Sequence, residues 1–383
     1  MELFHAHWSA ETGWSAPLPP ADGPATLVLV FGGAASGIGG PIADVVDAYP
    51  GSTVVGCSTA GEILADQIHD DGVVVSIARF AGATISSASA AVSSVEGSSA
   101  GGAALGRRLR AADENLQAVL VFSDGLGVNG SAMTAGLAGE VGPGVAISGG
   151  LAGDGERFQA TWVLVDGELR SGWITAVGLS GPGLEIGHGS RGGWDIFGPE
   201  RVVTRSEGNV LLELDGTPAL SLYKTYLGDR ADGLPATALL FPLSVRAPTG
   251  EDPPLVRTIL AVDESTQAMT FAGDIPQGSM AQLMRANFDR LIDGAQLAAT
   301  ETGPTEDAGP TLAIAISCVG RRIVLGARTE DELEAVLDAL PGDTLLTGFY
   351  SYGEISPADG VCALHNQTMT LTTLRERLDP ADD

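Results

Sequence analysis

The stretch GCSTAGEI, Gly56 to Ile63, follows the apolar run Thr53–Val55 and contains a cysteine, two hydroxyl side chains, two glycines and a carboxylate. A short apolar run rich in branched residues that leads into glycine is typical of a buried strand. Glycines in the turn after it allow positive φ and close approach of the backbone. We therefore predict a buried strand that ends in a tight turn carrying Glu62.

The same pattern recurs along the chain. PGSTVVGCSTAGEI (50–63) and PGDTLLTGFYSYGEI (341–355) share the Pro-Gly break, the threonine, the apolar pair and the Gly-Glu-Ile ending. A weaker third copy, VAISGGLAGDG, occupies residues 145–155. In each copy an apolar strand and a helix-like segment come before the break. Glu62, Asp154 and Glu354 are predicted at equivalent points, just past the carboxyl end of a strand.

The role of these acids has two interpretations. Each carboxylate could accept hydrogen bonds from the amides of its own turn, or it could reach into a cleft. The copies keep the glycines and the acid but replace Cys57 by Gly150 or Tyr350. The bend and the carboxylate, rather than the thiol, are therefore the shared requirement.

Alternating apolar segments lie between the copies. Residues 73–80, 161–179 and 368–374 predict half-buried antiparallel strands, and Asp166-Gly167 predicts a hairpin turn. The predicted fold class is α/β, with two mixed-sheet halves built from repeated strand-helix-strand units plus antiparallel hairpins. A glycine-rich stretch at 180–198 predicts a boundary, giving domains at 1–190 and 191–383.

Composition narrows the possible partners. The 383 residues are 44% hydrophobic and 18% charged, and 48 acidic against 20 basic side chains give a formal charge of −28. This charge disfavours nucleic acid and anionic membrane surfaces as partners. Three cysteines without a CxxC pair predict neither a disulfide framework nor a metal site. Without a signal-peptide pattern or a membrane-length apolar run, the protein is expected in the cytoplasm.

The strand-end turns and nearby charged residues supply groups that suit a small ligand. Backbone amides and hydroxyls suit a carboxylate or an amino acid, and clefts beyond strand ends are common ligand sites. Arg321 could pair with a ligand carboxylate, although a solvated surface charge is the alternative for it. Asp124 or Asp154 could hold a ligand ammonium. The predicted ligand-binding residues are Cys57, Ser58, Thr59, Glu62, Asp124, Gly150, Asp154, Arg321, Tyr350, Ser351, Tyr352, Glu354 and Asn366.

Patterns of catalysis are weaker. GCSTAG lacks the G-x-S-x-G spacing of a nucleophile elbow, and the glycine-rich turns lack a P-loop lysine. We therefore expect a protein that is not an enzyme. The alternative is a hydrolase or transferase that uses Cys57 with His69 or His365.

Several separated motifs in one order carry a family resemblance. GCSTAGEI, SGGLAGDG, SCVGRR, GFYSYGEI and HNQTMTLT follow one another across most of the chain. In this respect the sequence resembles the FIST proteins, which carry an N-terminal and a C-terminal FIST region in tandem. The resemblance implies a bacterial sensory module that binds a small molecule such as an amino acid. It also implies a separate signalling partner, such as a histidine kinase or a cyclic-dinucleotide enzyme.

Some proteins of this kind bind haem and report nitric oxide, so the resemblance raises a second function. A haem iron needs an axial side chain in an apolar pocket. His365, which begins HNQTMTLT, is the first candidate and His188 the second, with a surface or hydrogen-bonded histidine as the alternative for each. Three hypotheses follow: a metabolite sensor, a haem-based nitric-oxide sensor, and an enzyme that uses Cys57.

Overall fold

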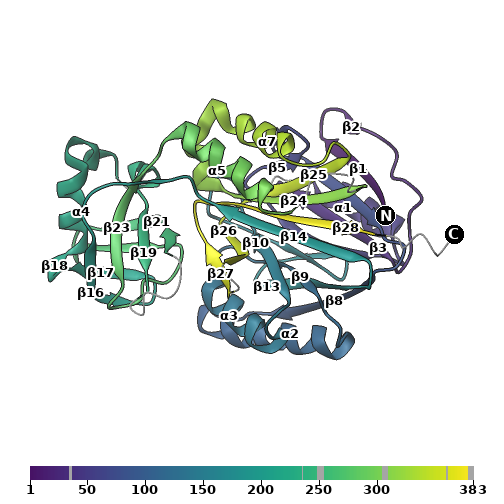
Figure 1. Ribbon diagram of the computed structural model, residues 1–383, viewed down its shortest axis with the longest axis horizontal. Helices are drawn as coiled ribbons and strands as arrows, with labels where there is room; N and C mark the ends of the chain where they lie inside the picture. The colour runs from purple at the N-terminus through teal and green to yellow at the C-terminus, as the bar shows by residue number, and fades with distance from the viewer. Residues whose placement is uncertain (34–36, 235, 248–253, 304–308, 359–360, 378–383) are drawn as a thin grey trace.

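The computed structural model describes residues 1–33, 37–234, 236–247, 254–303, 309–358 and 361–377 (Figure 1). Its mixed sheets contain parallel strand pairs and antiparallel hairpins, which confirms the predicted α/β class. A three-unit body and a smaller lobe make up the molecule; the lobe lies to the left in Figure 1. Within the described ranges, no helix is both long and apolar enough to cross a membrane.

The body contains three units with a similar order of elements, although unit 1, within its described residues, lacks the helix that precedes the parallel strand pair in units 2 and 3. Unit 1 contains β1 (Glu2–Ser9), β2 (Gly13–Trp14), β3 (Thr26–Gly32), α1 (Gly39–Ala48), β4 (Thr53–Ser58), β5 (Glu62–Leu64), β6 (Gln67–His69) and β7 (Val73–Arg79). Unit 2 contains β8 (Thr84–Ala91), η1 (Val95–Gly97), α2 (Ser98–Ala112), β9 (Ala118–Ser123), α3 (Gly130–Val141), β10 (Ala146–Leu151), β11 (Val163–Val165), β12 (Glu168–Arg170) and β13 (Trp173–Ser180). Unit 3 contains β14 (Leu184–Arg191), α5 (Phe288–Thr300), β24 (Thr311–Cys318), α6 (Val319–Leu325), η4 (Gly326–Arg328), α7 (Thr329–Asp338), β25 (Thr344–Ser351), β26 (Gly353–Ala358), β27 (Val361–His365) and β28 (Met369–Glu376).

The three units exchange hairpins in a ring. The parallel pairs β3–β4, β9–β10 and β24–β25 form the centres of three sheets. The hairpin strand β5 of unit 1 pairs with β25, β26 of unit 3 pairs with β10, and β11 of unit 2 pairs with β4. Each sheet is therefore completed by a hairpin from another unit, and all three body sheets contain strands from two units. The domain boundary at residue 190 stays a prediction.

Glycine is required at one point in each parallel pair. A Cβ on Gly56, Gly149 or Gly348 would lie 1.7, 1.8 or 1.7 Å from a carbonyl oxygen of the neighbouring strand. No side chain fits at such a distance, so the repeated glycine lets adjacent strands approach. The repeated glycine makes Phe349, one residue after Gly348, the equivalent of Cys57, which corrects the sequence alignment that used Tyr350.

The core lies where the units meet. Phe31, Phe122 and Phe349 come one from each unit, and their ring centroids are 5.0–6.1 Å apart. Helices α2 and α3 cover the body on one side, and α5 and α7 on the other (Figure 1). Burial of apolar surface between the units therefore stabilises the ring as one structure.

The lobe is inserted into unit 3 between β14 and α5. Its residues from Val203 to Leu283 form a hydrophobic core of their own. The elements of the lobe are β15 (Asp195–Ile196), β16 (Arg201–Glu207), β17 (Val210–Leu214), β18 (Thr217–Pro218), α4 (Ala219–Leu227), η2 (Gly228–Gly233), η3 (Ala236–Leu240), β19 (Leu243–Arg246), β20 (Leu255–Arg257), β21 (Ile259–Asp263), β22 (Ala268–Phe271) and β23 (Met280–Arg285). Two chain segments join the lobe to the body, and they pair with each other through β15 and β23.

Candidate functional site

A cleft of about 610 Å³ lies between the lobe and the body. The body contributes the turn after β9, the start of α3, the loop after β10 and the start of α6. The lobe contributes β21 and the segment from Phe271 to Asp274. A concave site of this volume between two lobes is typical of small-molecule binding.

The cleft gathers apolar side chains that are exposed to water. Among the described residues, nine large hydrophobic side chains are exposed, and four of them line this one cleft. They are Val95, Leu126, Phe158 and Leu260, each between 41% and 50% exposed. Single exposed apolar residues are common on proteins, whereas a convergent group indicates a binding surface.

An aromatic pair forms one wall of the cleft. The rings of Phe158 and Tyr352 stack with centroids 4.4 Å apart at an angle of 12°. Asp154 holds both residues: one oxygen accepts the Tyr352 hydroxyl proton and the Phe158 backbone N–H, the latter at 2.8 Å. Its other oxygen accepts the N–H groups of Gln159 and Ala160 at 2.8 and 2.9 Å. Burial acts to raise the pKa of Asp154, but these hydrogen bonds outweigh it and the pKa is lowered.

Polar groups connect the two walls. The Asn129 side chain accepts the Ala132 N–H at 2.9 Å, which caps α3, and donates to Asp274 of the lobe at 3.3 Å. Arg257 is buried in the lobe and donates to the Leu364 carbonyl of the body at 3.0 Å and to the Asp274 carbonyl at 3.1 Å. Burial lowers the pKa of Arg257 to about 10. These bonds join the lobe to the body beside the cleft.

Two of the turn acids are fully buried and hold their own turns. Glu62 accepts the Thr59 hydroxyl proton and the Gly72 N–H, the latter at 3.3 Å. Glu354 accepts the Ser351 hydroxyl at 2.7 Å and the Thr368 hydroxyl at 2.9 Å. Burial raises the pKa of Glu62 to about 8 and that of Glu354 to about 7. Neither acid lines the cleft.

Other predicted residues lie within strand contacts. Ser58 exchanges hydrogen bonds with the Trp162 backbone, which joins β4 to the segment before β11. Cys57 is fully buried, and burial raises its thiol pKa, which is typical of a structural cysteine. Gly150 packs against Phe349 in the core, because a Cβ there would lie 3.2 Å from that ring.

Arg321 and Tyr350 belong to a buried network. Arg321 is fully buried and forms an ion pair with Glu332 at 2.8 Å. It also donates to the carbonyl oxygens of Gly192 and Leu291. The Tyr350 hydroxyl donates to Glu332 at 2.9 Å. These donors are occupied by protein acceptors, so the geometry gives Arg321 a structural role.

Two further predicted residues differ in how well they are satisfied. Asp124 accepts the Thr161 hydroxyl and the Gly172 N–H at 3.0 Å each, and the Gly127 N–H at 2.6 Å, which orders the turn beneath the cleft. Asn366 is fully buried, and neither polar atom of its amide has a hydrogen-bond partner among the described residues.

The histidines do not fit an axial haem role at this site. His365 is buried within 3.2 Å of the Ser356 carbonyl, and burial lowers its pKa to about 4. His188 is exposed on β14. Neither lines the cleft, where Tyr352 and Cys318 stand instead. The Tyr352 hydroxyl is committed to Asp154, and burial raises the thiol pKa of Cys318.

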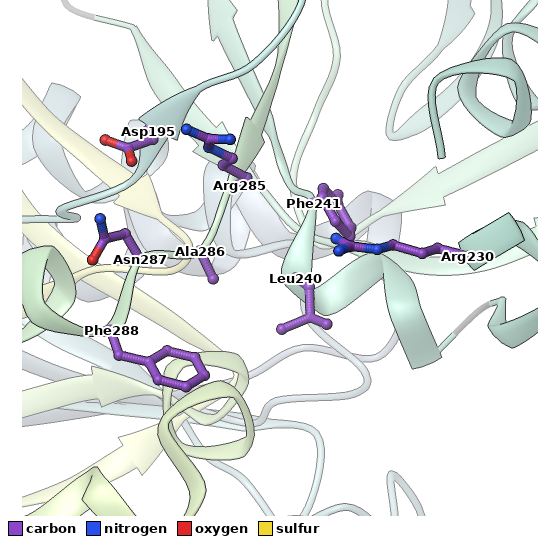
Figure 2. Close-up of a pocket in the computed structure, with 8 residues that line it drawn as sticks. All are labelled: Asp195, Arg230, Leu240, Phe241, Arg285, Ala286, Asn287 and Phe288. Carbon is purple, nitrogen blue, oxygen red and sulfur yellow. The ribbon is translucent and has the colours of Figure 1, made fainter. Parts of the chain in front are cut away.

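A smaller cavity of about 380 Å³ lies where the lobe joins the body (Figure 2). Asp195 and Arg285 lie in the two connecting segments, and Arg230 places its guanidinium 5.3 Å from the centre of the Phe241 ring. Asp195 forms an ion pair with Arg290 at the start of α5. The cavity therefore lies beside the two segments that join the lobe to the body.

Only Tyr352 among the predicted ligand-binding residues lines the cleft, while Asp154 lies behind its wall. Phe158, Leu260 and Asp274 were missed. Phe158 follows Glu156 and Arg157 in the loop after β10, and an aromatic residue after two charged ones is a usable sequence signal. Leu260 gives no such signal, because only the fold brings β21 opposite the body.

Comparison with known proteins finds two family models that match the chain in tandem. The FIST N domain model matches residues 26–217, and the FIST C domain model matches residues 219–357. The chain therefore belongs to the FIST family, whose domains are sensor domains of signal transduction. The junction between the two matches falls inside the lobe, between β18 and α4.

Individual relatives add little about function. Two uncharacterized proteins of Mycobacterium tuberculosis are each 27% identical over 181 residues, covering 46% of this chain. The chain spans about half the length of these curated relatives, at 47% of each. A crystal structure of chorismatase covers 97% of this chain and 98% of its own with a TM-score of 0.36 and 10% identity. That likeness is too weak to carry a function.

Proposed function

We propose that this protein is a sensor whose small-molecule ligand binds in the cleft between the lobe and the body. The convergence of Val95, Leu126, Phe158 and Leu260 on one cleft is the observation that carries the proposal. The FIST family membership supports a sensory role. A hydrolytic role for Cys57 has no comparable support, because its thiol is buried in the core.

The signal would be a change in the position of the lobe. A ligand that touches both walls favours the arrangement in which the walls are close, since a ligand shifts an equilibrium by its differential affinity for the two states. The two connecting segments, which pair at Asp195 and Arg285, would absorb the movement. A partner such as a histidine kinase or a cyclic-dinucleotide enzyme would then read the lobe position.

A thermal-shift screen of small molecules tests the proposal. A ligand at a hundred times its dissociation constant adds about 2.7 kcal/mol, which raises the melting temperature by a few degrees. Leu260→Ser in the cleft should abolish the shift. Leu297→Ser on α5, which changes a comparably exposed leucine outside the cleft, should leave the shift intact. Equal shifts in both variants would place binding elsewhere and contradict the proposal.

A further inference from the structure

The ionised side chains that line the cleft are all acidic, while the guanidinium of Arg257 is buried behind Gly273 and Asp274. Among the described residues that line the cleft, the ionised side chains are Glu156 and Asp274, and the lining contains no lysine, arginine or histidine. One carboxylate oxygen of Asp274 accepts a hydrogen bond from the Asn129 side-chain amide. The other oxygen accepts no protein hydrogen bond within the described ranges. The chain as a whole carries −28. A ligand carboxylate would therefore enter a repulsive field, whereas a cation would be attracted.

A buried hydroxyl on the lobe wall lacks a partner. Thr258 lines the cleft with only 5% of its surface exposed, and its Oγ1 has no hydrogen-bond partner among the described residues. An unsatisfied buried polar atom costs free energy, so a ligand that completes its hydrogen bonding gains that amount. A hydroxyl accepts an N–H, and the neighbouring carboxylates accept further N–H bonds.

The remaining side chains that line the cleft suit a ligand with an apolar skeleton. The stacked rings of Phe158 and Tyr352 present π-faces that attract a cation or pack against another ring. Leu126 from the body and Leu260 from the lobe add aliphatic surface. The cleft thus combines an apolar wall with negatively charged hydrogen-bond acceptors.

We propose that the ligand of this cleft is a protonated organic amine with an aromatic or aliphatic carbon skeleton. This inference rests on the proposed sensor function and names its ligand class. The ammonium donates to Asp274 and Thr258 on the lobe wall, Glu156 adds negative charge from the opposite wall, and the apolar part of the ligand packs against Phe158 and the two leucines. An amino acid fits less well, because Arg321, the predicted carboxylate partner, is consumed by Glu332.

A matched set of ligands on one carbon skeleton tests the class. Phenylbutylamine, phenylbutanol, phenylbutyrate and the trimethylammonium analogue are titrated into the full chain at pH 7 by calorimetry. We expect the amine to bind at least about tenfold more tightly than the alcohol and the carboxylate. The quaternary analogue should be weaker than the amine, because it cannot donate to Thr258. Equal or tighter binding of the alcohol or the carboxylate overturns the amine inference but leaves the sensor proposal standing.

Variants locate the interaction. Asp274→Asn keeps the oxygen that bonds to Asn129 and should weaken phenylbutylamine about tenfold without changing phenylbutanol. Thr258→Val should weaken the amine but not its trimethylammonium analogue. Asp47→Asn, at an exposed acid on α1 outside the cleft, is the charge-matched control. Amine binding that is unaffected by Asp274→Asn overturns the inference, and amine binding that also survives Leu260→Ser contradicts the cleft as the sensor site.

Discussion

The turns after β4 and β25 and the turn after β10 begin alike and end differently. In the first two, Glu62 and Glu354 enter a strand at once and accept protons from hydroxyls of their own turns. In the third, Asp154 is followed by residues 155–162 before β11 begins. Its carboxylate holds that loop and a tyrosine of unit 3.

This difference shows how a structural repeat can acquire a site. All three copies need the glycine at the strand crossing, so that part of the pattern is architectural. All three copies bury the acid, but only two of them enter a strand at that acid. The copy with the aspartate continues into a longer loop, which carries Phe158 to the cleft wall.

The largest expected effect comes from the part that the copies share. Gly149→Ala places a methyl group against the Val121 carbonyl and should lower the free energy of unfolding by about 3 kcal/mol or more. Gly139→Ala, in α3 with open space around it, should instead stabilise by about 0.5–1 kcal/mol. Urea denaturation compares the two. A mild effect at Gly149 would mean that the strand crossing relaxes easily.

The next largest effect concerns the turns that carry Glu62 and Glu354, and it depends on pH. Glu354 has a folded-state pKa of about 7 against an ordinary value of 4.5, so the folded protein binds more protons between these values. Stability should therefore fall as pH rises through this range. Glu354→Gln stays neutral and should be up to about 3 kcal/mol more stable than the parent at pH 8. A parent and variant with parallel stability profiles from pH 4 to pH 8 would refute this.

The stability contribution of the turn that carries Asp154 should depend on pH in the opposite direction. The pKa of Asp154 is lowered, so its contribution is present above its ordinary value of 3.8 and is lost as pH falls through the folded-state value. Asp154→Asn should cost about 2 kcal/mol at pH 7, because charge-assisted bonds to the loop are lost. It should also weaken phenylbutylamine binding through the displaced Phe158. Unchanged stability and affinity would remove Asp154 from the cleft wall.

The smallest effect on stability is expected in the loop of residues 155–162, at Phe158. Phe158 is 46% exposed, so Phe158→Ala should change the free energy of unfolding by less than about 1 kcal/mol. Phenylbutylamine binding should nevertheless fall about tenfold. Leu169→Ala, at an exposed residue of β12 outside the cleft, should affect neither quantity. Binding and stability are measured on the same samples.

Part of the site could be read from the residues. The three strand-end turns and their acids follow from local patterns of glycine, apolar runs and Pro-Gly breaks. Arg321 was predicted as a ligand group, yet it pairs with Glu332 one helix further on, because α6 turns its side chain inward. Whether a polar side chain faces a cleft or a neighbouring helix depends on packing that a single sequence does not encode locally.

The sequence by itself determined the repeated units, the α/β class and the family, since these rest on periodicity and on motifs within short stretches. Only the tertiary structure decided that hairpins pass between units, because the partners of β5, β11 and β26 lie far away in the chain. The cleft belongs to the same level. It exists where two surfaces, folded around separate cores, leave Phe158 and Leu260 facing each other's walls without burying them.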